Sequence, residues 1–490
     1  MVISLDEQKA IGPSEARRLG RSLLGGRFLE RGAERIHRAP FDAALDGPIL
    51  DAVESDAATA VSIAVAGAKA AGALAIHSRV AIVERLADLV DRDADRLAAT
   101  MTWQTGKPIR ETRREVVRAV DTLRLSARAA DLLAGEQIPT DTTSGGRALW
   151  AFSHRRPIGV VAAITPFNAP LNLLAHKLGP SIIGGNATII KPASAAPLTA
   201  VQLVELAIEA GCPPNAVNAL VGPAALGLSL VSNPEVRAIT FTGGARAARE
   251  IWGGAPLKRL VMELGGNSAN ILFDDADLEL AAGECVRGSF SNSGQSCNSV
   301  QRIIAPASLA SELAELMTAQ ISKLRVGDPF DDATDIGSMV SETESARVCE
   351  WLDAAVADGA VIQAGGSRTG ATLSPTLVTG ARPGMRVVDD EIFGPVAVIL
   401  EHSGDDDAIR LANATPFGLQ FGVFTRSLDR ALRSISVLDS GSVIVNRSSN
   451  YRLDSFVYGG VKQSGVGRED PRSTLRELTE EHFAVLGDRA

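Results

Sequence analysis

The sequence has few cysteines and histidines, and it lacks any long hydrophobic run. Its four cysteines show no CxxC or CxxH spacing, which argues against a structural zinc site and against a disulfide framework. No stretch of about 18 or more uncharged apolar residues occurs, and the amino terminus lacks the apolar core of a signal peptide. We therefore expect a cytoplasmic protein with free thiols, no bound metal and no membrane as a partner.

Basic residues are also scarce relative to acidic ones. The chain carries 49 Lys and Arg against 58 Asp and Glu, a formal net charge of −9. A nucleic-acid-binding protein normally presents a basic face, so nucleic acid is not expected as a partner. The 490 residues, 45% of them hydrophobic, are enough for two or three domains.

The spacing of apolar residues predicts an α/β protein. The pattern predicts irregular structure for residues 1–55 and helix from 56 to about 101. Strands and helices then alternate from 158 to 264, which indicates a parallel sheet. The alternation resumes in a second α/β segment that begins near residue 265, with a helix expected over 278–295.

One cysteine, Cys297, lies in an unusual segment. Residues 291–300 read SNSGQSCNSV, so its neighbours are small and polar, whereas buried structural cysteines usually lie among apolar residues. Cys212, Cys285 and Cys349 are interpreted as packed residues of the core. Cys297 is therefore the candidate nucleophile.

Seven motifs, in order along the chain, resemble those of the aldehyde dehydrogenase superfamily. The resemblance covers nearly the whole chain after about residue 20, and the order of the motifs makes it specific. The motifs are TPFNAP (165–170), IIKPAS (189–194), FTGG (241–244), MELGGN (262–267), NSGQSC (292–297), EIFGPV (391–396) and YGGVKQSGVGRE (458–469).

The resemblance implies a fold with two Rossmann-like parallel-sheet domains and a small β oligomerisation flap. Members of the family pair through this flap, so a homodimer or homotetramer is expected. The expected divisions are 1–135 with 157–264 for cofactor binding, 265–445 for the catalytic domain, 136–156 with 472–490 for the flap, and 446–471 for a loop that closes over the substrate and returns to the cofactor domain.

The resemblance assigns catalytic roles to three residues. Cys297 would attack the aldehyde, because thiolate addition gives a hemithioacetal whose alkoxide can expel hydride. The side-chain amide of Asn168 and the backbone N–H of Cys297 would bind that alkoxide. Glu263 would activate the water that hydrolyses the resulting thioester. Taken alone, Asn168 also suits a plain turn, and Glu263 also suits a surface charge.

NAD or NADP is the implied cofactor, although no GxGxxG loop is present. Lys191 would hold the adenosine ribose, Glu391 would hold the nicotinamide ribose, and the helix that opens after FTGG would receive the pyrophosphate. Gly244 replaces the usual serine and loses one hydroxyl donor. The expected cofactor residues are Thr165, Pro166, Phe167, Lys191, Ser194, Gly243, Gly244, Leu264, Glu391 and Phe393.

Ser194 bears on the choice between the two cofactors. Many members that use NAD alone carry glutamate at this position, where its carboxylate repels a 2′-phosphate by like charge. Serine removes that repulsion and leaves Lys191 free to pair with the phosphate. We therefore expect both cofactors to be used, with a lean to NADP.

Four residues, His176, Asn298, Arg447 and Arg452, are expected near the aldehyde. His176 stands where succinate-semialdehyde enzymes carry arginine, and it resembles the lactaldehyde and phosphonoacetaldehyde branch. Two arginines in the closing loop suit a carboxylate, phosphate or sulfonate tail. Two other interpretations stay open: His176 as a core histidine, and the arginines as one partner of Asp454 and one solvated side chain.

The predicted reaction is the oxidation of a small polar aldehyde to its carboxylic acid without CoA. A CoA-acylating semialdehyde dehydrogenase would not need Glu263. A cysteine hydrolase would need a histidine paired with Cys297, and none of the six histidines lies in a motif that suggests such a pair. A catalytically idle homologue is disfavoured by the intact set of Cys297, Glu263 and Asn168. Val457 stands where proline is usual, which leaves the geometry of the closing loop open.

Overall fold

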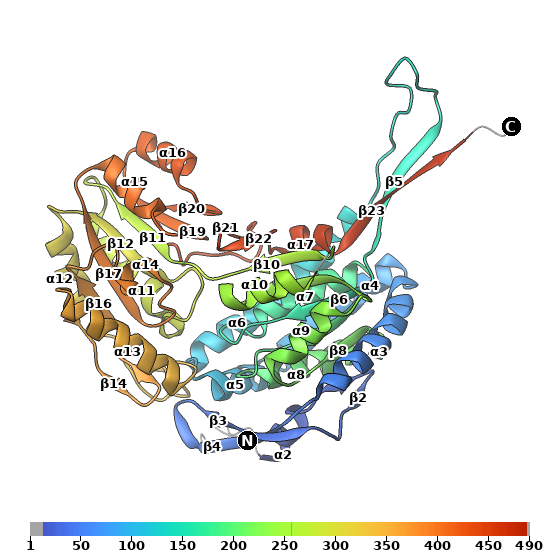
Figure 1. Ribbon diagram of the computed structural model, residues 1–490, viewed down its shortest axis with the longest axis horizontal. Coiled ribbons are helices and arrows are strands. Elements are labelled where there is room, and N and C mark those ends of the chain that lie inside the picture. The colour runs from blue at the N-terminus through green and yellow to red at the C-terminus, as the bar shows by residue number, and fades with distance from the viewer. Residues whose placement is uncertain (1–12, 256, 488–490) are drawn as a thin grey trace.

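The computed structural model describes residues 13–255 and 257–487 of the chain. Two α/β bodies lie beside each other, and a two-stranded arm projects from one of them (Figure 1). The chain folds most of the first body before residue 264 and most of the second after residue 267.

The first body is built on an eight-stranded sheet. Its five central strands are parallel, and short antiparallel strands close both edges. The central strands are rich in Val, Ile, Ala and Thr and are almost entirely buried, as expected where helices cover both faces. In spatial order the strands are β2 (Arg27–Phe28), β1 (Leu23–Leu24), β8 (Val217–Ala219), β7 (Ala187–Lys191), β6 (Val160–Ile164), β9 (Val236–Thr242), β10 (Arg259–Glu263) and β22 (Gly465–Val466).

Helices cover the two faces of this sheet (Figure 1). One face carries α7 (Asn172–Ile183) and α8 (Pro197–Glu209). Packed behind them are α4 (Ile76–Arg92), α5 (Ala94–Thr105) and α6 (Ile109–Arg128). The other face carries α3 (Glu54–Gly72), α9 (Ala224–Ser232) and α10 (Ala245–Gly254). Residues from both layers form the largest hydrophobic core.

The second body contains a seven-stranded sheet that is parallel except for one edge strand. Separate hydrophobic cores lie on its two faces. The strand order is β13 (Val361–Ala364), β16 (Thr376–Thr379), β17 (Val396–His402), β12 (Val300–Pro306), β11 (Ser268–Leu272), β19 (Gln420–Phe424) and β20 (Ser442–Val445). The surrounding helices are α11 (Leu278–Phe290), α12 (Ala310–Ile321), α13 (Glu342–Ala357), α14 (Arg386–Asp389), α15 (Asp405–Asn413) and α16 (Leu428–Val437).

The predicted alternation of strands and helices is confirmed, but three local predictions are wrong. The segment before residue 55 is not irregular, since it forms α2 (Pro13–Leu19) and the hairpin of β3 (Ala33–Ala39) and β4 (Asp42–Asp51); residues 1–12 lie outside the described part. The helix expected over 56–101 is instead three helices, α3, α4 (Ile76–Arg92) and α5 (Ala94–Thr105).

The third correction concerns the helix expected to reach residue 295. Helix α11 ends at Phe290, because Asn292 and Ser293 adopt left-handed backbone angles with φ of 50° and 51°. Residues with these backbone angles cannot continue a right-handed α-helix. The turn that results carries Cys297 away from the helix axis and toward the first body.

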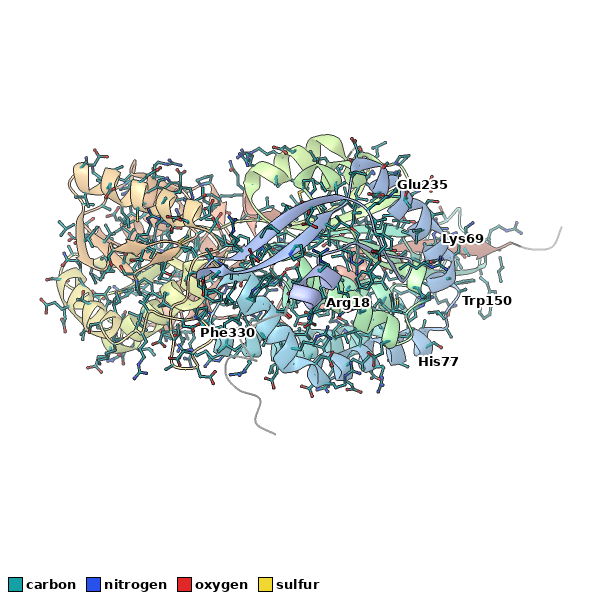
Figure 2. The ribbon with its side chains drawn as sticks, turned by 90° about the horizontal axis from the view of Figure 1, so that it is seen from below. Arg18, Lys69, His77, Trp150, Glu235 and Phe330 are labelled. Atoms are coloured by element: carbon teal, nitrogen blue, oxygen red, sulfur yellow. The ribbon has the colours of Figure 1, made fainter. Side chains whose placement is uncertain are left out.

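The arm consists of β5 (Trp150–Pro157) and β23 (Thr479–Leu486), which pair antiparallel along eight residues. It extends well beyond the body in Figure 1, and Figure 2 labels Trp150 at the same end of the molecule. Large apolar side chains are left uncovered on it, with Trp150 72% and Leu486 62% exposed. The arm falls within the predicted flap, whose last residues, 488–490, lie outside the described part.

Within residues 13–255 and 257–487, no single helix is long and apolar enough to cross a membrane. Helices α3 and α4 are long and apolar enough only when taken together, and the angle between them is 114°. All four cysteines are free thiols. The same residues contain no group of three or more His, Cys, Asp or Glu side chains that could hold a metal ion.

Candidate active site

Four neighbouring strands of the first sheet bring the predicted motifs to one edge. Residues 165–168 follow β6, Lys191 ends β7, Gly243 follows β9 and Glu263 ends β10. These strands are parallel, so their carboxyl ends meet at the same side of the sheet. That side is where open α/β sheets commonly bind ligands.

The second sheet supplies the opposite wall through the amino ends of two adjacent strands. Cys297 lies just before β12, and Glu391 and Phe393 lie just before β17. The thiol therefore faces the carboxyl ends of the first sheet from across the gap between the two bodies.

A cavity of about 650 Å³ lies between these walls. This volume falls within the usual range of about 300–1,000 Å³ for small-molecule and cofactor sites. Every residue predicted to act in catalysis or to bind the cofactor lines it. These residues are Cys297, Glu263, Asn168, Lys191, Ser194, Thr165, Pro166, Phe167, Gly243, Gly244, Leu264, Glu391 and Phe393.

The two glycines of MELGGN allow the walls to meet closely. A Cβ atom on Gly265 would lie 2.0 Å from a carboxylate oxygen of Glu391, and one on Gly266 would lie 2.4 Å from the carbonyl oxygen of Cys297. Only glycine permits such an approach of backbone to its neighbours. These glycines therefore bring the backbone of the first body against the opposite wall.

The thiol of Cys297 has an unexpected neighbour. Its Sγ atom lies 3.1 Å from the hydroxyl oxygen of Tyr458. Burial raises the pKa of the Cys297 thiol to about 11, while the hydrogen bond with Tyr458 and the positive charge of Arg452 act to lower it; the charges of Glu391 and Glu263 act in the opposite direction. The resting site thus favours the neutral thiol, and its ionisation depends on the groups around it.

Glu263 is buried at the floor of the cavity. Neither of its carboxylate oxygens has a hydrogen-bond partner among the described residues. Burial, followed by repulsion from Glu469, raises its pKa well above the ordinary value of 4.5. A carboxylate of this kind binds a proton readily near neutral pH, which suits a general base.

Behind Glu263 lies a buried ion pair that the sequence did not suggest. The ammonium of Lys177 donates to the carboxylate of Glu469 and, over 2.7 Å, to the hydroxyl of Thr242. Burial acts to raise the pKa of Glu469, but the charge of Lys177 and other cations outweighs it, and the pKa is lowered. In the sequence, the only indication of this pair was that each residue lies in or next to a singled-out segment: Glu469 is the last residue of the last motif, and Lys177 follows His176.

Asn168 is held beside the turn that carries the nucleophile. Its side-chain amide donates to the carbonyl oxygen of Gln295 over 2.9 Å. Its own carbonyl oxygen accepts from Lys107 at 3.3 Å and from the side chain of Asn292 at 3.1 Å. These contacts hold the Asn168 amide against Gln295, which precedes Cys297 by two residues, and both Asn168 and Cys297 line the cavity.

The other end of the cavity fits a dinucleotide. Lys191 lies at its edge, and burial lowers the pKa of that ammonium to about 8. Gly244 is the N-cap of α10, and a Cβ atom there would meet nothing within 4 Å, so room for a phosphate group is open at the helix N-terminus. Glu391 accepts from the Gly266 N–H over 3.0 Å, and burial raises its pKa to about 7.

Arg35 extends this end of the site, although the sequence did not suggest it. Its guanidinium donates to the carbonyl oxygen of Ser194 over 2.9 Å and to Asp51 over 2.8 Å. Its charge also acts to lower the pKa of Lys191. Arg35 comes from β3, in the segment predicted to be irregular, so no motif could have indicated its place.

The residues expected near the aldehyde lie in different places. His176 is fully buried, and its Nε2 lies 3.0 Å from Asp454. Burial lowers the pKa of His176, so the neutral ring is favoured. Arg452 lies beside it at 3.5 Å, and its guanidinium stacks on the Tyr458 ring with Cζ 3.7 Å from the centroid.

None of the four residues expected near the aldehyde lines the cavity, and Arg447 and Asn298 contact other groups. Arg447 pairs with Glu284 over 3.0 Å, and its side chain is 52% exposed. The side-chain oxygen of Asn298 accepts hydrogen bonds from the hydroxyl of Ser296 and from the side-chain amide of Asn450. Asp454, considered as a partner for one of the arginines of the loop, instead pairs with Arg118 over 2.7 Å.

Comparison with known proteins agrees with this geometry. The model of the aldehyde dehydrogenase family matches residues 33–483. The chain belongs to this family. It is 41% identical over 429 residues to 3-sulfolactaldehyde dehydrogenase of Priestia aryabhattai, covering 87% of this chain and 90% of the relative. It is 37% identical over 447 residues to aspartate-semialdehyde dehydrogenase 1 of Pseudomonas canavaninivorans, covering 91% and 95%.

Among solved structures, the NADP-dependent glyceraldehyde-3-phosphate dehydrogenase from Bacillus halodurans C-125, complexed with NADP, superposes with a TM-score of 0.93. That match has 34% identity and covers 95% of this chain and 98% of the other.

Membership of the aldehyde dehydrogenase family confirms the predicted fold and the predicted class of reaction. The protein is an oxidoreductase that converts an aldehyde with NAD or NADP. The alternatives of a cysteine hydrolase and of a CoA-acylating enzyme are not favoured.

Proposed function

We propose that Cys297, Asn168 and Glu263 oxidise a small aldehyde with an anionic tail to its carboxylic acid. The observation that carries this proposal is the shared cavity: all three side chains line it together with the residues that fit the cofactor. The thiol and the carboxylate approach it from opposite bodies, as a nucleophile and a water-activating base should.

The steps follow from the groups present. The thiolate of Cys297 adds to the aldehyde carbon, and the alkoxide so formed accepts hydrogen bonds from the Asn168 amide and the Cys297 N–H. NAD or NADP, when bound, supplies the acceptor for the hydride that leaves this carbon. Glu263 then takes a proton from water, the water oxygen adds to the thioester carbon, and the carbon–sulfur bond breaks to release the acid and the thiolate.

Arg452 is the proposed anchor for the anionic tail. Its side chain is only 9% exposed, and its Nε atom has no hydrogen-bond partner among the described residues. Its guanidinium also lies 3.9 Å from Glu469, which pairs with Lys177 as well, and the neighbouring Asp454 pairs with Arg118. The three relatives support an anionic tail, because their named aldehydes carry a sulfonate, a carboxylate or a phosphate.

Arg447 and Asn298 remain predictions as substrate residues, and His176 is proposed to hold Arg452 in place. The ring of His176 lies between Asp454 and Arg452 and is too deeply buried to meet solvent. Its role would then be indirect, through the position of the guanidinium.

The adenosine end supports the use of both cofactors with a lean to NADP. Ser194 supplies no carboxylate to repel a 2′-phosphate, Arg35 donates to the carbonyl oxygen of Ser194, and the charges of both Arg35 and Asp51 act on Lys191. A partly exposed charge pair contributes about 1 kcal/mol, and relief of a like-charge clash adds a similar amount. Together these effects change the preference by about ten- to thirtyfold.

Assembly into a homodimer or homotetramer is proposed on the basis of the arm. Its uncovered apolar side chains include Trp150, Phe483 and Leu486. The second body offers a matching surface, because β20 is an edge strand and α16 exposes Leu428 and Leu432 beside it. The division into the four predicted segments and a cytoplasmic location are kept as part of the proposal.

A panel of aldehydes tests the proposed function. kcat/KM would be measured with NAD and with NADP for short aldehydes ending in sulfonate, phosphate or carboxylate, each beside a neutral analogue of equal length. We expect the anionic members to exceed their neutral partners by at least about tenfold, or about 1.4 kcal/mol. Equal values would remove the anionic tail from the proposal, and a requirement for CoA would replace hydrolysis by acyl transfer.

A further inference from the structure

Tyr458 is a feature that the reaction scheme above does not use. It opens the YGG segment that the sequence offered only as a family motif. In the structure its hydroxyl oxygen is 3.1 Å from Sγ of Cys297, although 161 residues separate the two along the chain. The Tyr458 side chain is buried, so the hydroxyl has little access to water.

The direction of this hydrogen bond follows from the charge on sulfur. A neutral thiol can either donate or accept, but a thiolate can only accept. Once Cys297 is ionised, the phenol must therefore be the donor. Burial raises the pKa of the Tyr458 phenol well above 10, so the hydroxyl keeps its proton under the conditions in which the thiolate forms.

The ring that carries the hydroxyl is held from behind. Arg452 lies over the face of Tyr458, with Cζ 3.7 Å from the centroid, and cation–π contacts of this kind become stronger when they are shielded from water. Three charged groups act on the Cys297 thiol: Arg452 favours its ionisation, and Glu391 and Glu263 oppose it.

We propose that Tyr458 is a further catalytic residue, whose hydroxyl donates to Sγ of Cys297 and favours the thiolate before an aldehyde arrives. The buried site otherwise disfavours a charge on sulfur, so a charge-assisted hydrogen bond is the local means of forming the nucleophile. This inference rests on the proposed role of Cys297 as the nucleophile.

The test measures alkylation of the thiol itself in the full-length enzyme without cofactor or aldehyde. Wild type, Tyr458→Phe and Tyr451→Phe would react with iodoacetamide from about pH 6 to pH 10.5, with the peptide that contains Cys297 followed by mass spectrometry. Phenylalanine keeps the ring under Arg452 and removes only the hydroxyl. Tyr451 is the matched control, because it is the other of the two tyrosines in the chain and its ring contacts Phe456 and Arg447.

The pKa of the Cys297 thiol is about 11, so the alkylation rate should rise with pH across the whole range. We expect Tyr458→Phe to react about tenfold more slowly than the wild type at each pH up to about 10, which corresponds to a thiol pKa raised by about one unit. Tyr451→Phe should follow the wild type. With an aldehyde and cofactor present, kcat/KM of Tyr458→Phe should be lower than that of the wild type in the same pH range.

Two results would overturn the proposal. An unchanged alkylation rate would show that the hydroxyl does not favour the thiolate, and a faster reaction at every pH would show that it only shields the sulfur. A different failure would affect the proposed function instead: if full alkylation of Cys297 left dehydrogenase activity intact, Cys297 would not be the nucleophile, whatever the alkylation rates.

Discussion

The two ends of the cavity are built in different ways. At the cofactor end, the residues sit at or directly after strand ends, as Lys191 and Gly243 do, and the parallel register of the sheet brings them together. At the end that holds the thiol, the residues beside Cys297 that do not line the cavity, Arg452 and Tyr458, come from a connection that contains no long helix or strand. Short motifs therefore specify the first end well, whereas packing of the connection decides the second.

The largest effect should come from the residue at which the two ends meet. Cys297→Ala removes the nucleophile, and we expect the dehydrogenase rate to fall by more than about 10⁴-fold. Binding of NADP, followed by quenching of protein fluorescence, should change little, because the cofactor end is built from other strands. Turnover within about tenfold of wild type would mean that Cys297 does not carry the acyl group.

Glu263→Gln should separate the two halves of the reaction. A burst of about one NAD(P)H per site should remain, with steady-state turnover lower by about 10²- to 10³-fold, since the water is no longer activated. Loss of the burst would assign Glu263 to an earlier step.

The pH dependence of hydrolysis follows from the same residue. The pKa of Glu263 is raised, and only its carboxylate form accepts a proton, so hydrolysis in the wild type should decline as pH falls through that raised pKa. Stopped-flow measurement of the burst and the following rate would show this decline in wild type and its absence in the variant.

Arg452→Gln tests the aldehyde end more directly. Loss of a hydrogen bond to a charged group costs about 1.5–3 kcal/mol, so kcat/KM for an anionic aldehyde should fall about ten- to hundredfold relative to a neutral one of equal length. The ratio is the relevant measure, because Arg452 also acts on Cys297 and affects both substrates. Arg447→Gln is the comparison variant: its guanidinium pairs with Glu284 and is half exposed, so the ratio should change less than in Arg452→Gln, and an equal loss would place both arginines at the tail.

The smallest effect is expected at the cofactor end. Ser194→Glu places a carboxylate between Lys191 and Arg35, and it should raise the KM for NADP about ten- to thirtyfold more than the KM for NAD. The comparison of kcat/KM for both cofactors in wild type and variant measures this shift. A wild type that prefers NAD a hundredfold, or a variant with the wild-type preference, would show that another contact sets the choice.

Local geometry explains which parts of the site could be predicted. The residues proposed as nucleophile and base and those proposed to bind the cofactor lie in motifs where a buried strand meets a turn, and such a turn has few conformations. The same reasoning failed at the amino-terminal hairpin and at the end of α11. In the latter case the residue pattern predicted helix as far as residue 295, but the left-handed backbone angles of Asn292 and Ser293 end it earlier.

Local patterns of residues were enough to predict the α/β class, the order of the motifs, the proposed nucleophile Cys297 and the proposed base Glu263, and they show an uncharged residue at Ser194. Which side chains surround these residues depends on how the folded chain packs. Lys177 meets Glu469 across 292 residues, and Arg452 meets His176 across 276. These contacts depend on how the two bodies and the irregular connection between them pack together. A local pattern of apolar and polar residues cannot indicate contacts between residues so far apart in the sequence.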